Sequence, residues 1–219
     1  MLVRNWMTQD VLTVTPDMQV IKASNLMKKH GIRRLPVVDG SGVLIGIVSD
    51  RNIKEAMPSK ATTLDMHELS YLLSQLKLQD VMTRKPITVR DDDLIETAAI
   101  IMEERKIGGL PVVNKDGELC GILTESDVFK CMLRFTGAHI GGLLLAFEKS
   151  DKPGTLRPIM EVLYRHGASI ISVLTTHENE NGLRRLYIRV RPMPQDREAA
   201  LIEEFKTGSE LVFWRSNTD

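Results

Sequence analysis

One pattern occurs twice in the sequence, with Gly46 aligned to Gly121, and this duplication restricts the fold more than any other feature. The alignment needs no gap between Met7 and Ile53. A fixed period with identities at apolar and turn positions is typical of a duplicated structural unit. The sequence therefore predicts two copies of one small unit. The aligned segments are Met7-Thr8 with Met82-Thr83, Thr13-Val14 with Thr88-Val89, Leu35–Val38 with Leu110–Val113, and Gly46–Asn52 with Gly121–Asp127.

The pattern of apolar and turn residues in each copy predicts the element order β-α-β-β-α. In the first copy a short extended segment ends at Val14, and an apolar stripe at helical spacing ends before Gly31. Two strands then flank the turn at residues 39–42, and a helix follows Ser49. An apolar strand that enters a helix behind a hydroxyl residue directs backbone N–H groups toward an anion. Each copy therefore ends on a candidate anion site.

The rest of the chain predicts a linker and a third domain. Residues 61–78 carry leucines at helical spacing, so we expect a linker helix packed across the two copies. After Thr136 the pattern becomes βαββαβ, a ferredoxin-like arrangement. The predicted class is α/β (α+β). The predicted domain limits are 1–60 and 79–136 for the two copies, 61–78 for the linker helix, and 140–219 for the last domain.

Charge and composition exclude several classes of protein. The 29 basic and 29 acidic residues give no net charge, so a general basic footprint for nucleic acid is absent. No apolar run approaches a membrane span, and the first residues lack the apolar core of a signal peptide. Cys120 and Cys131 lack a metal-ligand spacing and suit a reducing compartment. We expect a cytoplasmic protein that binds neither nucleic acid nor membrane.

The residues show no catalytic pattern. No histidine or cysteine lies in a metalloprotease, Cys/His or nucleophile-elbow frame. Asp91, Asp92 and Asp93 are candidate metal ligands, but they also precede a predicted helix, where carboxylates are favoured. The helix explanation is favoured. We therefore expect no catalytic residue and no metal site.

The duplicated Leu-Pro-Val-Val, turn, Gly-Ile-Val/Leu-Ser/Thr-x-x-Asn/Asp pattern resembles the CBS-domain family, and the two copies resemble a CBS pair, or Bateman module. The last domain, with Asp151-x-Pro-Gly154-x-Leu156, resembles an ACT domain. The whole arrangement is similar to the acetoin-utilisation protein B family, whose members are regulatory. CBS pairs bind adenosyl compounds between the two copies, so the resemblance implies AMP, ADP, ATP, S-adenosylmethionine or NADH as ligand.

The family motif implies that a Ser/Thr holds phosphate and an Asp holds ribose. The second copy has both, Thr124 and Asp127, whereas the first copy has Ser49 and Asn52. Both hydroxyls of a ribose can donate to a carboxylate, whereas an amide accepts only through its oxygen. Thr124-x-x-Asp127 is also the spacing of a reciprocal helix cap.

The family's phosphate-binding basic pair is Arg33 and Arg34 in the first copy, and two glycines replace it in the second. Guanidinium groups bind phosphate through charge-assisted contacts. We expect one dominant site, where Thr124 and Asp127 receive both arginines. Its other expected contacts are an apolar adenine slot of Val11, Ile32 and Ile122, together with Thr8.

The last domain suggests a second ligand-binding site, for an effector. In ACT domains the loop equivalent to Asp151, Pro153, Gly154 and Leu156 borders an effector site, often for an amino acid. Taken alone, the loop predicts a tight strand-to-helix turn. The leading hypothesis is a non-enzymatic sensor that forms a homodimer or higher homo-oligomer. A scaffolding dimer with degenerate sites is the alternative, and an enzyme has less support.

Overall fold

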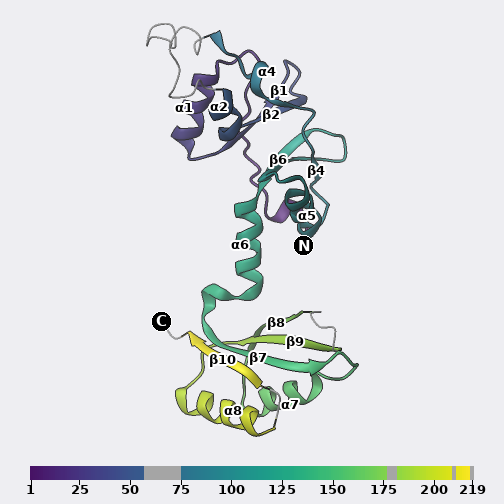
Figure 1. Ribbon diagram of the computed structural model, residues 1–219, viewed down its shortest axis with the longest axis vertical. Helices are drawn as coiled ribbons and strands as arrows, with labels where there is room; N and C mark the ends of the chain where they lie inside the picture. The colour runs from purple at the N-terminus through teal and green to yellow at the C-terminus, as the bar shows by residue number, and fades with distance from the viewer. Residues whose placement is uncertain (57–74, 177–181, 209–210, 218–219) are drawn as a thin grey trace. The chain divides into compact units, whose positions relative to one another are not determined.

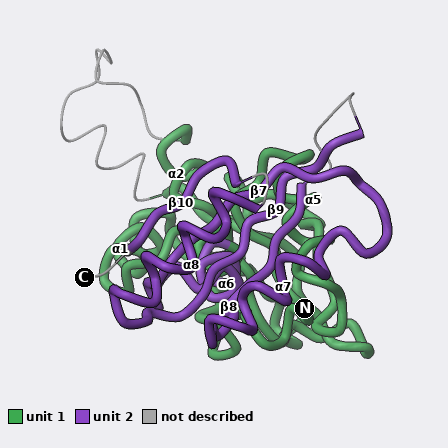
Figure 2. The backbone as a smooth tube through the Cα atoms, turned by 90° about the horizontal axis from the view of Figure 1, so that it is seen from below, with its two compact units in different colours: residues 1–128 green, residues 129–219 purple. Residues whose placement is uncertain are grey.

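The computed structural model describes residues 1–56, 75–176, 182–208 and 211–217. The chain divides into two compact units, residues 1–128 and 129–219 (Figure 2). The first unit contains both copies of the duplicated pattern, called here the first and second repeat. Among the described residues no helix has the length and apolar character needed to cross a membrane.

The first repeat packs two helices against a hairpin. Its first helix ends at Gly31, whose positive φ of 64° lets its N–H reach the carbonyls of Met27 and Lys28. Asp39 shapes the hairpin turn by accepting hydrogen bonds from the N–H groups of Ser41 and Val43. The elements are α1 (Val20–His30), β1 (Arg34–Val38), β2 (Leu44–Ser49) and α2 (Asp50–Ala56) (Figure 1).

The second repeat has the same order and confirms the predicted fold class. Its opening strand β4 has only two residues and pairs parallel with β5, while in the first repeat Val14 alone bridges Val37. The predicted linker helix, residues 61–78, falls largely on 61–74, which lie outside the described residues. The elements are α4 (Leu78–Val81), β3 (Thr83–Arg84), β4 (Val89–Arg90), α5 (Ile95–Arg105), β5 (Gly109–Val113), β6 (Leu119–Thr124) and α6 (Glu125–Thr136).

The segment that leads into each repeat pairs with the hairpin of the other repeat. Thr8 and Ile122 exchange two backbone hydrogen bonds of 3.0 Å, so residues near the N-terminus border β6. In the same way β3 pairs antiparallel with β2, with Ile47 opposite Thr83. We call this reciprocal pairing the segment exchange. It joins the two repeats through backbone hydrogen bonds.

The exchange extends to the helix starts. The N–H of Val3 donates to the carbonyl of Asp93 at 2.9 Å, and the N–H of Leu78 donates to that of Met18 at 2.9 Å. Val3 and Leu78 are both fully buried. Val3 aligns with Leu78 in the duplicated sequence, and Met18 aligns with Asp93. The two hydrogen bonds are therefore equivalent, so the two repeats share contacts as well as sequence.

Two glycines of the motif make room for the exchanged segments. A Cβ added at Gly46 would lie 2.6 Å from Sδ of Met82 and 3.1 Å from the carbonyl of Thr83. Gly121 has the same relation to Met7 and Thr8. Neither glycine has a positive φ, so their lack of a side chain serves close packing rather than backbone freedom.

Gly46→Ala and Gly121→Ala should each lower the free energy of unfolding by about 1–3 kcal/mol, because the methyl group overlaps a packed methionine and the backbone behind it. Urea denaturation measures the change. Gly40→Ala is the control, since an added Cβ there meets nothing within 4 Å. Equal midpoints for all three variants would contradict the close packing.

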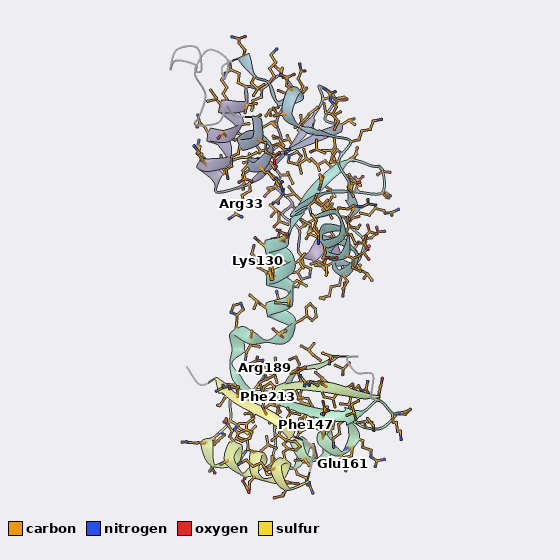
Figure 3. All side chains as sticks on the ribbon, in the orientation of Figure 1. Arg33, Lys130, Phe147, Glu161, Arg189 and Phe213 are labelled. Atoms are coloured by element: carbon orange, nitrogen blue, oxygen red, sulfur yellow. The ribbon has the colours of Figure 1, made fainter. Side chains whose placement is uncertain are left out.

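The second unit has the predicted βαββαβ order. Its four strands form an antiparallel sheet in the order β10-β7-β9-β8. Phe147, labelled in Figure 3, packs edge-on against Phe205 of α8 at 4.9 Å between ring centroids. The elements are η2 (Ala138–Ile140), β7 (Gly142–Ser150), α7 (Arg157–Arg165), β8 (Ile170–Thr175), β9 (Leu183–Val190), α8 (Gln195–Gly208) and β10 (Leu211–Asn217).

One face of this sheet carries the core. Side chains alternate between the two faces of a strand, so Leu145 and Phe147 of β7 share the face that packs on α7 and α8. Phe213 lies opposite Ala146 in the sheet register and therefore belongs to the other face, beside Tyr187. Phe213 retains 39% of its surface exposed.

Candidate functional site

Thr124 and Asp127 meet at the junction of β6 and α6. The Thr124 hydroxyl donates to Oδ2 of Asp127 at 2.6 Å, and the Thr124 N–H donates to the same oxygen at 3.0 Å. Asp127 is only 6% exposed, and it is the only buried charged side chain among the described residues. Burying a charge costs free energy unless it is paired or hydrogen-bonded. The local hydrogen bonds thus hold a carboxylate at the start of α6.

The first repeat makes the same contacts without the charge. The Ser49 hydroxyl donates to Oδ1 of Asn52 at 2.6 Å, and the Ser49 N–H donates to it at 3.0 Å. The N–H of Asn52 donates back to the Ser49 hydroxyl at 3.2 Å, which completes a helix cap. An amide therefore accepts the same two hydrogen bonds, at the same distances, as the carboxylate does. The charge of Asp127 is not needed for the cap.

The segment exchange brings two further predicted residues together. Thr8 bridges Ile122, which lies two residues before Thr124 on β6. Thr8 is exposed, Ile122 is 9% exposed, and Val11 is half-buried a few residues beyond Thr8. The N-terminal segment that contains Thr8 therefore forms part of the surroundings of Thr124. Ile32 packs instead against the core of the first repeat.

Arg34 crosses from the first repeat to the glycine pair of the second. A Cβ added at Gly109 would lie 3.1 Å from Cδ and 3.3 Å from Nε of Arg34, and one added at Gly108 would overlap the end of its guanidinium. Gly109 is the register partner of Thr124 in the β5–β6 hairpin. The glycines that replace the basic pair therefore give Arg34 the space to lie beside Thr124.

Burial lowers the pKa of the Arg34 guanidinium, and the nearby carboxylates of Glu125 and Asp50 oppose that shift. The positive charge of Arg33 adds a smaller lowering of the same pKa. Glu125 and Asp50 are equivalent positions, each following the hydroxyl residue of its repeat. The sequence prediction did not include them, although their place after Ser49 and Thr124 could have suggested it.

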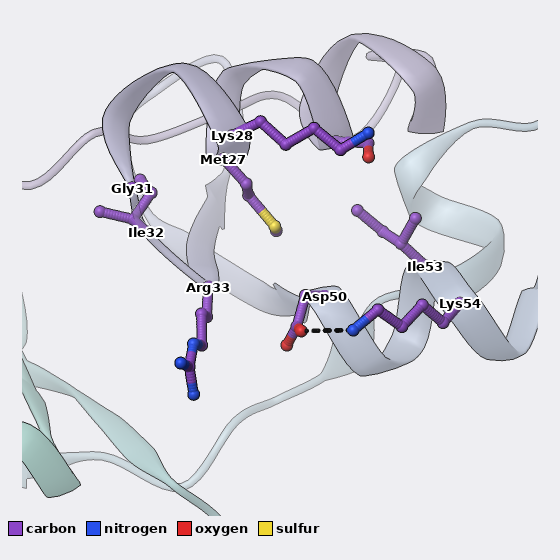
Figure 4. Close-up of a pocket in the computed structure, with 9 residues that line it drawn as sticks. Met27, Lys28, Gly31, Ile32, Arg33, Asp50, Ile53 and Lys54 are labelled. Atoms are coloured by element: carbon purple, nitrogen blue, oxygen red, sulfur yellow. Dashed lines mark hydrogen bonds and ion pairs between the residues drawn. The ribbon is translucent and has the colours of Figure 1, made fainter.

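Arg33 has a different environment from Arg34. It lines, with Ile32, a hollow of about 440 Å³ between the end of α1 and α2 in the first repeat. Figure 4 shows Met27 and Ile53 on either side of this hollow, and Lys54 paired with Asp50 at 3.0 Å. Of the predicted basic pair, Arg34 is thus the residue that lies against Gly109, the register partner of Thr124.

The predicted effector residues line one hollow in the second unit. It measures about 320 Å³ and is formed by residues 151–156 with Arg184. Nη1 of Arg184 lies 3.2 Å from Oδ1 of Asp151. Gly154 has a φ of 84°, which suits the tight turn before α7. Sequence reasoning missed Arg184, which lies on β9 and is distant in the chain.

The aspartates at residues 91–93 act in the turn before α5. Asp93 accepts a hydrogen bond from the Arg90 N–H at 2.7 Å, and Asp92 forms an ion pair with the Arg90 side chain. Within the described part of the chain, no group of three or more His, Cys, Asp or Glu residues is placed to hold a metal ion.

Comparison with known proteins identifies the duplicated pattern. The sequence profile described as CBS domain matches residues 3–59 and 78–134, which together exceed half of the chain. The chain belongs to the CBS-domain family. The two matches cover the two repeats, so the CBS pair predicted from the sequence is confirmed.

Solved CBS pairs have the same fold. CBSX2, a protein of Arabidopsis thaliana, was solved in complex with AMP; it is 35% identical, with a TM-score of 0.51 over 62% of this chain and 98% of that chain. A putative acetoin utilization protein from Vibrio cholerae is 32% identical, with a TM-score of 0.52 over 64% of this chain and 95% of that one. The CBS pair of protein MJ0100, in complex with 5′-methylthioadenosine and S-adenosyl-L-methionine, is 26% identical, with a TM-score of 0.51 over 60% and 99%.

The share of each curated relative that matches differs widely. The chain spans 92% of a CBS domain-containing protein of Dictyostelium discoideum, at 32% identity over 133 residues. It spans 37% of an inosine-5′-monophosphate dehydrogenase of Korarchaeum cryptofilum, at 31% identity over 196 residues. In that relative the matching part is a fraction of an enzyme.

Ser49→Ala and Thr124→Ala should each destabilise the ligand-free protein by about 1 kcal/mol, because each removes a helix cap. Urea denaturation of the full chain measures both changes. Ser126→Ala, at an exposed position in the first turn of α6, should change stability by less than about 0.5 kcal/mol. A large difference between the Ser49 and Thr124 variants would contradict the equivalence of the two caps.

Proposed function

We propose that the protein is a cytoplasmic, non-enzymatic regulatory sensor that binds an adenine nucleotide or related adenosyl compound between its two CBS repeats. The dominant site uses Thr124, Asp127 and Arg34. Arg33, Ile32, Ile122, Val11 and Thr8 complete the set predicted from the sequence. Ligand binding regulates by favouring one arrangement of the repeats over another, which requires a difference in affinity between the arrangements.

The observation that carries the proposal is the buried carboxylate of Asp127. The first repeat caps its own equivalent helix, α2, with an amide at the same distances, so Asp127 adds a negative charge that the geometry of the cap does not require. A carboxylate beside a hydroxyl and a guanidinium is suited to a ribose and a phosphate. The AMP and S-adenosyl-L-methionine complexes of related CBS pairs support an adenosyl ligand.

Asp127→Asn tests the site without removing the cap. The amide of Asn52 already makes this cap in the first repeat, so the variant should fold with nearly unchanged stability. Hydrogen bonds to a charged group contribute on the order of 1.5–3 kcal/mol, so AMP affinity should fall about tenfold to a hundredfold. Isothermal titration calorimetry with AMP, ATP, S-adenosylmethionine and NADH gives the affinities, and thermal unfolding monitors the cap.

Asn52→Ala is the comparison variant in the other repeat, and thermal unfolding must accompany it because it also removes the hydrogen bonds that Ser49 donates to Asn52. Its effect on AMP affinity should be small, since that position already lacks a carboxylate. Equal weakening by Asp127→Asn and Asn52→Ala would show that the site is not centred on Asp127. If the wild-type protein binds none of the four ligands, a structural dimer with degenerate sites would be favoured. Turnover of a bound nucleotide would favour an enzyme.

The second unit supplies a second effector site or a dimer contact in this proposal. Its βαββαβ fold and the loop with Asp151, Pro153, Gly154 and Leu156 resemble an ACT domain. Supporting an amino-acid effector, Arg184 places a guanidinium at the hollow beside this loop, where it could pair with an α-carboxylate. The partly exposed second face of the sheet, which carries Phe213, supports self-association.

Both parts of this proposal have direct tests. Titration with the twenty amino acids should give binding that Arg184→Gln weakens about tenfold or more, the expected loss of a charge-assisted contact. Light scattering should return at least twice the chain mass of 24.7 kDa at micromolar concentration. A monomeric mass would contradict the proposed dimer contact. The absence of binding to any amino acid would contradict the proposed effector site.

A further inference from the structure

The carboxylate of Glu125 and the guanidinium of Arg34 converge on one point above Gly108. A Cβ added at Gly108 would lie 2.7 Å from Oε2 of Glu125 and would overlap Nη2 of Arg34. The Glu125 N–H donates to the Gly108 carbonyl at 3.1 Å, which holds the start of α6 against the glycine pair. An acidic group thus borders the arginine that the adenosyl site offers to a phosphate.

The equivalent residue of the first repeat forms an ion pair with a lysine on its own helix. Asp50 accepts a hydrogen bond from Lys54 at 3.0 Å, one helical turn further on. The position equivalent to Lys54 in α6 is Phe129, so Glu125 lacks this lysine. Glu125 is exposed, and its negative charge acts on the guanidinium of Arg34.

We propose that Glu125 sets the charge preference of the adenosyl site, so that the site favours adenosyl ligands of low negative charge over nucleoside triphosphates. The ligand class is a nucleoside monophosphate or an adenosyl compound with a cationic sulfonium. This inference rests on the proposed function, because it concerns the same site.

Electrostatics gives the direction of the effect. Every phosphate added to the ligand brings further negative charge toward Glu125, and unit charges a few ångströms apart interact appreciably near a protein surface. The phosphate must also compete with Glu125 for Arg34. A sulfonium has the opposite sign and is attracted by the same carboxylate. Salt screens such interactions, so discrimination should weaken as ionic strength rises.

The test compares Glu125→Gln with the wild-type protein by calorimetric titration of adenosine, AMP, ATP and S-adenosylmethionine. Removal of the carboxylate should raise the ratio of ATP to AMP affinity by about tenfold at low salt and lower the affinity for S-adenosylmethionine. Adenosine affinity should stay within about twofold, because adenosine carries no charge.

Glu55→Gln is the matched control. It removes the same charge from an exposed position on α2 of the first repeat, where Glu55 pairs with Arg51 at 2.8 Å. The ratio of ATP to AMP affinity should not change in this variant. Asp50 is unsuitable as a control because its charge also acts on Arg34.

The outcomes separate this inference from the proposed function. Binding of adenosyl ligands with the same ATP to AMP ratio in the wild-type protein and Glu125→Gln would overturn the inference and leave the proposed function standing. An equal rise of the ratio in Glu55→Gln would also overturn it, since net charge alone would then explain the effect. Failure of both proteins to bind any of the four ligands, adenosine included, would overturn the proposed function together with the inference.

Discussion

The first unit depends on backbone hydrogen bonds that join each repeat to the leading segment of the other. Thr8 pairs with Ile122 on β6, and Thr83 pairs with Ile47 on β2. These bonds satisfy strand edges that a single repeat would leave open. They also decide what surrounds the start of α6, because the segment containing Thr8 belongs to the first repeat and pairs with β6 of the second. The fold and the candidate site therefore have one physical basis.

The duplication predicted most of this architecture, because an ungapped offset fixes element order and type in both repeats at once. It could not predict the segment exchange. Met7 and Met82 match one another, as do Gly46 and Gly121, so pairing within a repeat and pairing between repeats fit the same pattern. The choice depends on how the chain crosses from one hairpin to the other, which is a property of the folded unit rather than of local residue preference.

Within the candidate site, the sequence predicted the one contact that depends on local spacing, that of Thr124 with Asp127. Thr124 and Asp127 are three residues apart at a helix start, and that spacing alone brings them together. The positions of the basic pair were harder to predict, because Arg33 and Arg34 are adjacent in the chain but lie in different surroundings. The glycines at 108 and 109 looked like a lost function in the sequence, yet they are the space that Arg34 occupies. Placements that depend on both repeats, such as that of Arg34 and Glu125 at Gly108, leave no periodic signal in the chain.

The segment exchange has a consequence for assembly. Each repeat displays a complementary edge for the other, and every bond that joins them within one chain is equally available between two chains. A first repeat of one molecule and a second repeat of another would form the same unit, which is the geometry of domain swapping. The covalent connection makes the pairing within one chain dominant by raising the effective concentration of the partner repeat. The first and second repeats, expressed as separate chains, would accordingly associate without any engineered interface.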